Sequence, residues 1–173
     1  MGEAVDMNQS VTFATLPIPQ PLGRVEFRPT LESVKKLGYG VDDESGWLVG
    51  DPADEMVHPV LLSTYLWWPQ GFYVQESTGI GHFQMFKDRF PGLFDYPYLH
   101  GKTHARFVQP FKAGSTLFAD VSVCEKYERR NKEFIVIRAQ FSLADGSEIA
   151  EYRHTVMLRS HAPIRGLAAS GVA

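Results

Sequence analysis

The sequence contains a single cysteine, Cys124, among its 173 residues. One cysteine cannot form an intramolecular disulfide, and a cysteine-based zinc site needs several thiolates, so both kinds of cross-link are excluded. Cys124 lies in an alternating apolar pattern, which predicts a small buried side chain and suits a reducing compartment. We therefore expect a cytoplasmic protein.

Long hydrophobic runs are also absent. No stretch reaches about 18 uninterrupted apolar residues, and the start of the chain has Glu3 and Asp6 in place of the basic segment and apolar run of a secretory signal. The formal net charge is -3, and no cluster of Lys and Arg is long enough to follow a phosphate backbone. These features argue against membrane and nucleic-acid partners and favour small molecules or proteins.

Apolar and aromatic residues are well represented. The sequence is 44% hydrophobic and contains 12 Phe, 7 Tyr and 3 Trp, which is enough to form a core for one domain. We expect that domain over residues 22–160. Proline-rich residues 1–21 predict an extended N-terminal tail, and Gly- and Ala-rich residues 161–173 predict a C-terminal tail.

Apolar residues recur with different periods along the chain. Residues 58–72 are nearly all apolar or aromatic, which predicts a buried helix. Four later segments alternate as strands do: 103–109, 116–126, 133–143 and 148–159. The separating segments 129–132 and 144–147 are typical of turns, and Asp-Gly in the second favours a hairpin. The order predicts an α+β domain whose antiparallel sheet wraps the apolar helix.

Short motifs near the first of these strands occur in a recognisable order. Leu99-His100-Gly101 comes first, Arg106-Phe107 follows, and Gln109–Leu117 has the sequence QPFKAGSTL. This order resembles the passage LHG…(R/Q)P(L/F)(R/K)xGDTL of MaoC-like hydratase/dehydratase domains, and it is most similar to their N-terminal-type repeat.

The resemblance extends upstream. Residues 30–43 look like the leading helix and GDxNP loop of that family, and Val57-His58-Pro59 looks like the AHP motif that opens its central helix. The similarity covers about residues 22–160. It implies a hot-dog fold, in which an antiparallel sheet wraps a long central helix.

The same resemblance implies an activity. Members of the MaoC-like family act on acyl thioesters of coenzyme A or an acyl carrier protein, add water reversibly across a 2-enoyl double bond, and use no other cofactor. Active members contain GDxNPxH, whose Asp and His hold the water; here Asp43 is retained, but Leu48 stands about where the His belongs. Non-catalytic N-terminal repeats also lack that His. We therefore expect a hydro-lyase component that forms a homodimer or, more in keeping with the missing His, pairs with a second hot-dog subunit that supplies the dyad.

Hydration requires a base, an acid and donors for the enolate oxygen. Asp43 is a candidate for orienting the water, although an Asp in an acidic loop is more often simply solvated. His58 is expected where the buried helix begins, and there it either faces the thioester carbonyl or only bonds the helix start.

Two further histidines are catalytic candidates on the first strand. Alternation places His100 and His104 on one face, where paired imidazoles can shuttle protons or bind a metal. No carboxylate or third His stands at a fixed spacing from them, so we expect no metal site. His82, His154 and His161 are expected to be structural or surface residues.

Aromatic side chains are concentrated between residues 65 and 98. They are first of all core residues, but their density also suits a wide acyl tunnel or a large subunit interface. We expect five of them to contact substrate: Tyr65, Trp67, Trp68, Phe72 and Phe83.

Other functions stay open at this point. A hot-dog thioesterase would use Asp43 to activate water against the thioester carbonyl, and would release free thiol. A non-catalytic acyl-binding or assembly subunit would bind ligand or a partner without turnover. A pocket adapted to an unusual cyclisation or dehydration is a further alternative, for which the sequence offers no test.

Overall fold

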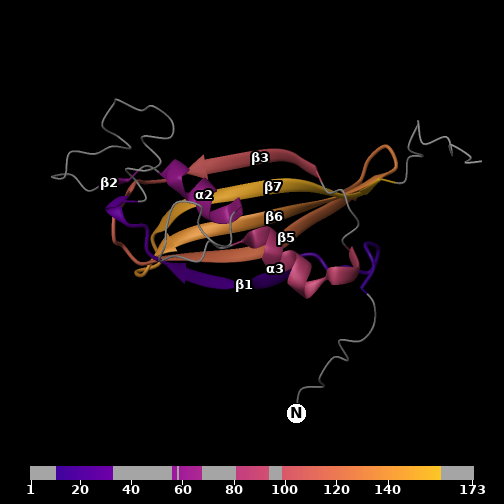
Figure 1. Ribbon diagram of the computed structural model, residues 1–173, viewed down its shortest axis with the longest axis horizontal. Helices are drawn as coiled ribbons and strands as arrows, with labels where there is room; N and C mark the ends of the chain where they lie inside the picture. Colours follow the sequence, from indigo (N-terminus) through magenta and orange to yellow (C-terminus); the bar gives the residue numbers. More distant parts are fainter. Residues whose placement is uncertain (1–10, 33–55, 58, 68–80, 94–98, 161–173) are drawn as a thin grey trace, which may run out of the picture.

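Five antiparallel strands form one sheet along the length of the molecule (Figure 1). The structure is a computed structural model that describes residues 11–32, 56–57, 59–67, 81–93 and 99–160. The strand order is β1-β5-β6-β7-β3. The strands are β1 (Gln20–Phe27), β3 (Leu99–Phe107), β5 (Leu117–Glu128), β6 (Lys132–Leu143) and β7 (Glu148–Ser160). A second, two-stranded sheet pairs β2 (Met56–Val57) with β4 (Phe111–Lys112).

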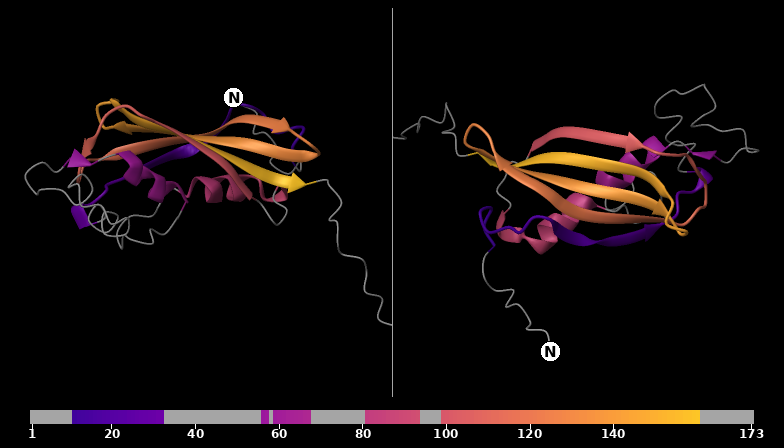
Figure 2. Two further views of the ribbon diagram at one scale, coloured as in Figure 1. Left: turned by 90° about the horizontal axis from the view of Figure 1, so that it is seen from above. Right: turned by 180° about the vertical axis from the view of Figure 1, so that it is seen from behind.

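The helices lie together on one face of the large sheet, as the view from above shows (Figure 2). They are the 3-10 turn η1 (Pro59–Leu61), α2 (Leu62–Trp67), α3 (His82–Arg89) and the 3-10 turn η2 (Pro91–Leu93). The α+β class is confirmed, but within the described residues the helical layer is divided between α2 and α3. No helix in the described part of the chain is long and apolar enough to cross a membrane.

Both predicted hairpin turns are present. Between β5 and β6, Arg130 and Asn131 take φ angles of 52° and 57°, and positive φ at both central residues is the geometry that matches the twist of a two-residue hairpin. Between β6 and β7, Gly146 takes φ 87°, and the Asp145 carboxylate accepts the backbone N–H of Ser147 at 2.9 Å. Local turn chemistry therefore sets the register of three consecutive strands.

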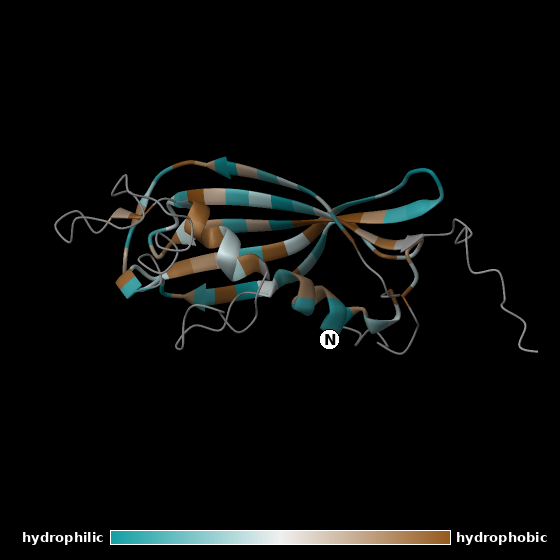
Figure 3. Cartoon of the chain, turned by 45° about the horizontal axis from the view of Figure 1, so that its top comes forward, coloured by the Kyte–Doolittle hydropathy of each residue, from teal (hydrophilic) through white to brown (hydrophobic). Residues whose placement is uncertain are grey.

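The core lies between the helices and the inner face of the sheet. Strand residues alternate between apolar and polar along β5, β6 and β7, which produces the bands visible in Figure 3. The Phe27 ring packs 5.0 Å from Tyr65 and 5.8 Å from Phe141, so β1, α2 and β6 meet in one aromatic contact. The opposite face of the sheet is not covered by the described helices.

The packed chain begins upstream of Leu22, where the domain was expected to start. Leu16 is only 1% exposed and belongs to the core. The Lys126 ammonium on β5 donates hydrogen bonds to the backbone carbonyls of Phe13, Ala14 and Leu16 at 2.9, 2.7 and 2.7 Å. This single cation holds the segment before β1 against the sheet.

Cys124 is half-buried, not buried as its alternating context predicted. The register of β5 with β6 shifts between Val123 and Glu125, so Cys124 is the extra residue of a β-bulge. Its thiol donates to the Val136 carbonyl at 3.5 Å, and burial raises the pKa of the thiol. A raised pKa reduces the thiolate fraction, so the described environment does not favour a reactive cysteine.

Candidate functional site

β3 contains a bulge at Gly101 that reverses the side-chain alternation of the strand. The register with β7 shifts across Gly101. His100 before the bulge and Thr103 after it are opposite two buried residues of β7, Val156 and His154 respectively. Opposite residues of an antiparallel pair project from the same face, so His100 and Thr103 both point toward the helices although they are three positions apart.

His104 consequently lies on the other face of the sheet. It is opposite Arg153, an exposed residue whose guanidinium pairs with Glu151 at 2.8 Å. The expectation that His100 and His104 share a face is wrong. Regular alternation would place two residues four positions apart on one face, but the extra residue Gly101 shifts the second half of the strand by one position.

Three histidines gather on the inner face, and we call His82, His100 and His154 the histidine cluster. The Nε2 atom of His100 lies 2.8 Å from the Thr103 hydroxyl, and the same hydroxyl lies 3.0 Å from Nδ1 of His154. The His154 ring is 4.7 Å from the His82 ring and 6.0 Å from the His100 ring, measured between centroids. Nδ1 of His82, the first residue of α3, donates to the Leu66 carbonyl on α2.

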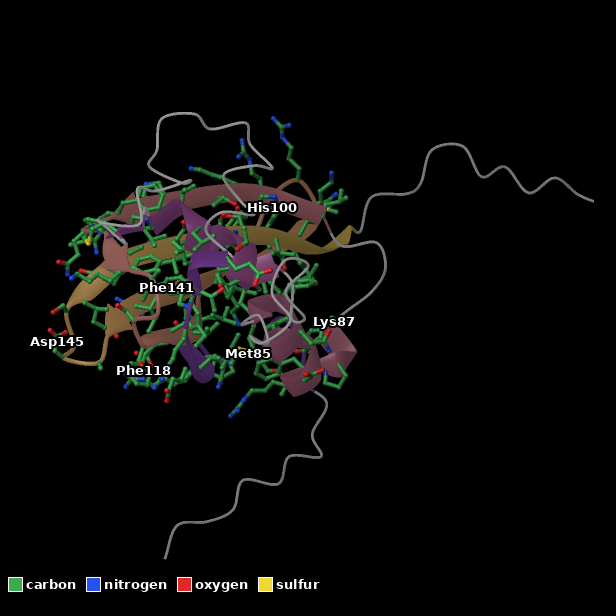
Figure 4. All side chains as sticks on the ribbon, turned by 60° about the vertical axis from the view of Figure 1, so that its left-hand side comes forward. Met85, Lys87, His100, Phe118, Phe141 and Asp145 are labelled. Carbon is green, nitrogen blue, oxygen red and sulfur yellow. The ribbon has the colours of Figure 1, made fainter. Side chains whose placement is uncertain are left out.

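The three rings differ in exposure, and burial lowers the pKa values of two of them. His82 and His154 are 0% exposed, whereas His100 is exposed at the edge of the sheet, where Figure 4 labels it. Burial lowers the pKa of His82 to about 4; the Leu66 carbonyl opposes this shift and the charge of His100 adds to it. Burial, with the charges of His82 and His100, lowers the pKa of His154 to about 3. Both buried rings are neutral at pH 7.

Solved structures with this arrangement of sheet and helices include hydratases and dehydratases. An (R)-hydratase from A. caviae involved in PHA biosynthesis has a TM-score of 0.57 and 16% identity, over 84% of this chain and 98% of that one. A MaoC-like dehydratase from Rhodospirillum rubrum has a TM-score of 0.58 and 9% identity, over 87% and 97%. The ChsH1-ChsH2 complex from Mycobacterium tuberculosis has a TM-score of 0.59 and 11% identity, over 83% and 86%.

The chain has the hot-dog fold. The fold implied by the sequence motifs is therefore confirmed. Neither a protein-family model nor the sequence of any curated protein matches the chain. At these identities the structural likeness establishes the fold, and the chemistry has to be argued from the chain's own residues.

Several predicted site residues cannot be placed in this hot-dog domain. The following lie outside the described residues: Asp43, His58, Trp68 and Phe72. Trp67 ends α2, and only its backbone is described. Tyr65 and Phe83 are 2% and 8% exposed and belong to the hydrophobic core. Their contact with substrate stays a prediction.

His82 and His154 were expected to have no functional role, yet they lie beside His100. The alternation of the strand predicted over 148–159 contains a clue, because His154 occupies the same face as the apolar residues Tyr152 and Val156. His82 offers no such signal, since its neighbours arise from the packing of α3 on α2. In the part of the chain that the structure describes, no group of three or more His, Cys, Asp or Glu residues is placed to hold a metal ion.

Proposed function

We propose that the chain is one component of a cytoplasmic enoyl-thioester hydratase or 3-hydroxyacyl-thioester dehydratase. Its substrate would be an acyl group carried as a thioester on coenzyme A or an acyl carrier protein, with no other cofactor. The observation that supports this reaction best is the histidine cluster on the inner face of a hot-dog sheet, directly beside the edge strand β3. Structures of the same fold include an (R)-hydratase and a MaoC-like dehydratase.

His100 has the properties that acid–base work at this edge requires. Its ring is exposed and is held through Nε2, so it can meet a ligand from the side of the sheet edge. In the hydration direction it would accept a proton from water while the water oxygen attacks the β-carbon and the C=C electrons move toward the thioester oxygen. The protonated ring then returns a proton to the α-carbon, so that H and OH are added across the double bond.

The buried rings would keep that proton on His100. Burial disfavours a positive charge on His82 and on His154, and their pKa values of about 4 and about 3 make either one a poor proton acceptor near pH 7. The proton taken from water would therefore stay at the exposed ring, where the α-carbon can receive it.

The edge of the sheet supports a two-part enzyme. β3 is the terminal strand, and three large apolar residues at or just after it are well exposed: Leu99 at 55%, Phe107 at 42% and Val108 at 47%. Apolar side chains on an edge strand favour pairing with another chain. The structures of the HadBC and ChsH1-ChsH2 complexes each contain two named components. A second copy of this chain would cover this edge, whereas a different hot-dog subunit would cover it and also supply the Asp/His dyad that this chain lacks at Leu48.

The reaction is tested by following enoyl-thioester absorbance with purified protein over a panel from crotonyl-coenzyme A to bulky aromatic substrates. His100→Ala should lower the rate by at least tenfold, because it removes the proposed acid–base group. His104→Ala is the matched control, since it deletes a histidine from the outer face of the same strand and should change the rate by less than about twofold. A loss confined to His104→Ala would refute the assignment.

Product analysis separates the other candidate functions. A thioesterase would release free thiol, which a thiol reagent detects and which hydration does not produce. A non-catalytic acyl-binding subunit would bind the thioester in a calorimeter and give neither reaction. Sedimentation equilibrium on the same sample shows whether the chain pairs with itself, and Leu99→Lys should weaken that pairing.

A further inference from the structure

We propose that Thr103 and His154 are positioning residues that fix the tautomer and the orientation of the His100 ring. The functional consequence rests on the proposed function, because it concerns the acid–base role of His100. The hydrogen-bond arrangement itself belongs to the folded chain and can be measured whether or not the protein has activity.

The arrangement follows from counting protons. The Thr103 hydroxyl has one hydrogen and contacts two imidazole nitrogens, Nε2 of His100 at 2.8 Å and Nδ1 of His154 at 3.0 Å. It can therefore donate to one ring and accept from the other. A protonated His100 has hydrogen on both nitrogens, so its Nε2–H must donate to Thr103, and Thr103 must donate to the lone pair on Nδ1 of His154.

The same arrangement serves the neutral state of His100. If Nε2 keeps its hydrogen, the ring gains and loses its reacting proton at Nδ1 while both hydrogen bonds of Thr103 stay unchanged. The reverse arrangement would direct the lone pair of His100 toward Thr103 and place the hydrogen on Nδ1, so the ring could not act as a base toward a ligand. A neutral His154 with its lone pair on Nδ1 thus selects the productive tautomer of His100.

His154 is itself rigidly held, as a positioning residue must be. Its ring stacks on Tyr152 with a centroid distance of 5.9 Å and an interplanar angle of 6°. The Tyr152 hydroxyl donates to the Pro59 carbonyl at 2.9 Å, which ties β7 to the start of the helical layer. On another side lies the His82 ring, anchored on the Leu66 carbonyl. These contacts leave the His154 ring little freedom to turn away from Thr103.

The bulge at Gly101 makes the contact possible. Without the extra residue, His100 and Thr103 would project from opposite faces, and the hydroxyl could not reach both rings. Thr103 lies on the exposed edge strand, so its side chain can be changed without opening the core.

The test uses the full chain with three variants. Thr103→Val keeps the shape but removes the hydroxyl, Thr103→Ser restores the hydroxyl, and Thr155→Val makes the same change on the outer face of β7. Nitrogen-15 NMR reports the tautomer of His100. The signals of this ring are the ones that disappear from the spectrum in the His100→Ala variant. Circular dichroism confirms that each variant is folded.

The wild-type chain should show His100 in the Nε2–H form. Thr103→Val should shift the tautomer ratio by about fivefold, corresponding to one hydrogen bond of about 1 kcal/mol, and should lower kcat by up to about fivefold with little change in KM. Thr103→Ser and Thr155→Val should keep the wild-type tautomer ratio and kcat within about twofold.

Two results would overturn the inference: an Nδ1–H tautomer in the wild type, or a Thr103→Ser variant as altered as Thr103→Val. If the wild type shows the expected tautomer and hydroxyl dependence but hydrates no thioester, the positioning by Thr103 and His154 stands and the proposed reaction fails.

Discussion

Acidification should destabilise this domain because two fully buried histidines, His82 and His154, must stay neutral in the folded state. Each has a folded pKa below the ordinary value of 6.5, at about 4 and about 3, with burial as the main cause. Below pH 6.5 the two histidines bind protons in the unfolded chain but stay neutral in the folded chain. Stability contributed by these groups is fully present above that pH and is lost as the pH falls toward the folded pKa values.

The size of the effect follows from the same values. At about pH 5 both rings are largely protonated in the unfolded chain and largely neutral in the folded one. Each pH unit in this window costs about 1.4 kcal/mol per group, so each histidine contributes about 2 kcal/mol of destabilisation relative to about pH 7.5. Together they contribute about 4 kcal/mol, a large part of the stability of an ordinary domain.

The assay is urea unfolding followed by tryptophan fluorescence at a series of pH values. His154→Leu should abolish about half of the pH dependence whatever it does to stability at neutral pH, because one titrating group is gone. His104→Ala is the matched control, since it removes an exposed histidine from the outer face and leaves both buried rings in place. Stability that stays flat down to about pH 5, or an unchanged slope in His154→Leu, would refute the view that these rings are buried and neutral.

Two further changes test how the sheet is held together. Lys126→Met removes the donor to three backbone carbonyls and should lower the free energy of unfolding by about 2 kcal/mol. Amide hydrogen exchange over residues 12–16 should become faster in this variant. The control Lys112→Met changes an exposed residue and should lower the free energy of unfolding by less than about 0.5 kcal/mol. Combining Arg130→Asn with Asn131→Gly should raise the thermal midpoint by relieving about 1 kcal/mol at positive φ, and a lower midpoint would contradict the turn geometry.

Much of the sheet could be predicted from the sequence because strand and turn signals are local. Side-chain alternation is a property of consecutive residues, so the segments 133–143 and 148–159 lie within the observed strands β6 and β7, and the segment 116–126 lies within β5 except for Thr116. The turn at 144–147 depends on Gly146 and the turn at 129–132 on Asn131, and both residue types accept positive φ. The ordered motifs around β3 also predicted the hot-dog fold correctly.

The tertiary structure alone decided the site. The bulge at Gly101 placed His100 and His104 on opposite faces, and no alternation rule contains that extra residue. The packing of α3 and β7 brought His82 and His154 beside His100, across gaps of 18 and 54 positions in the chain. Their neutrality also depends on burial, which is a property of the assembled core. Local pattern therefore determined the strands and turns, whereas register and packing between distant segments determined which histidines meet.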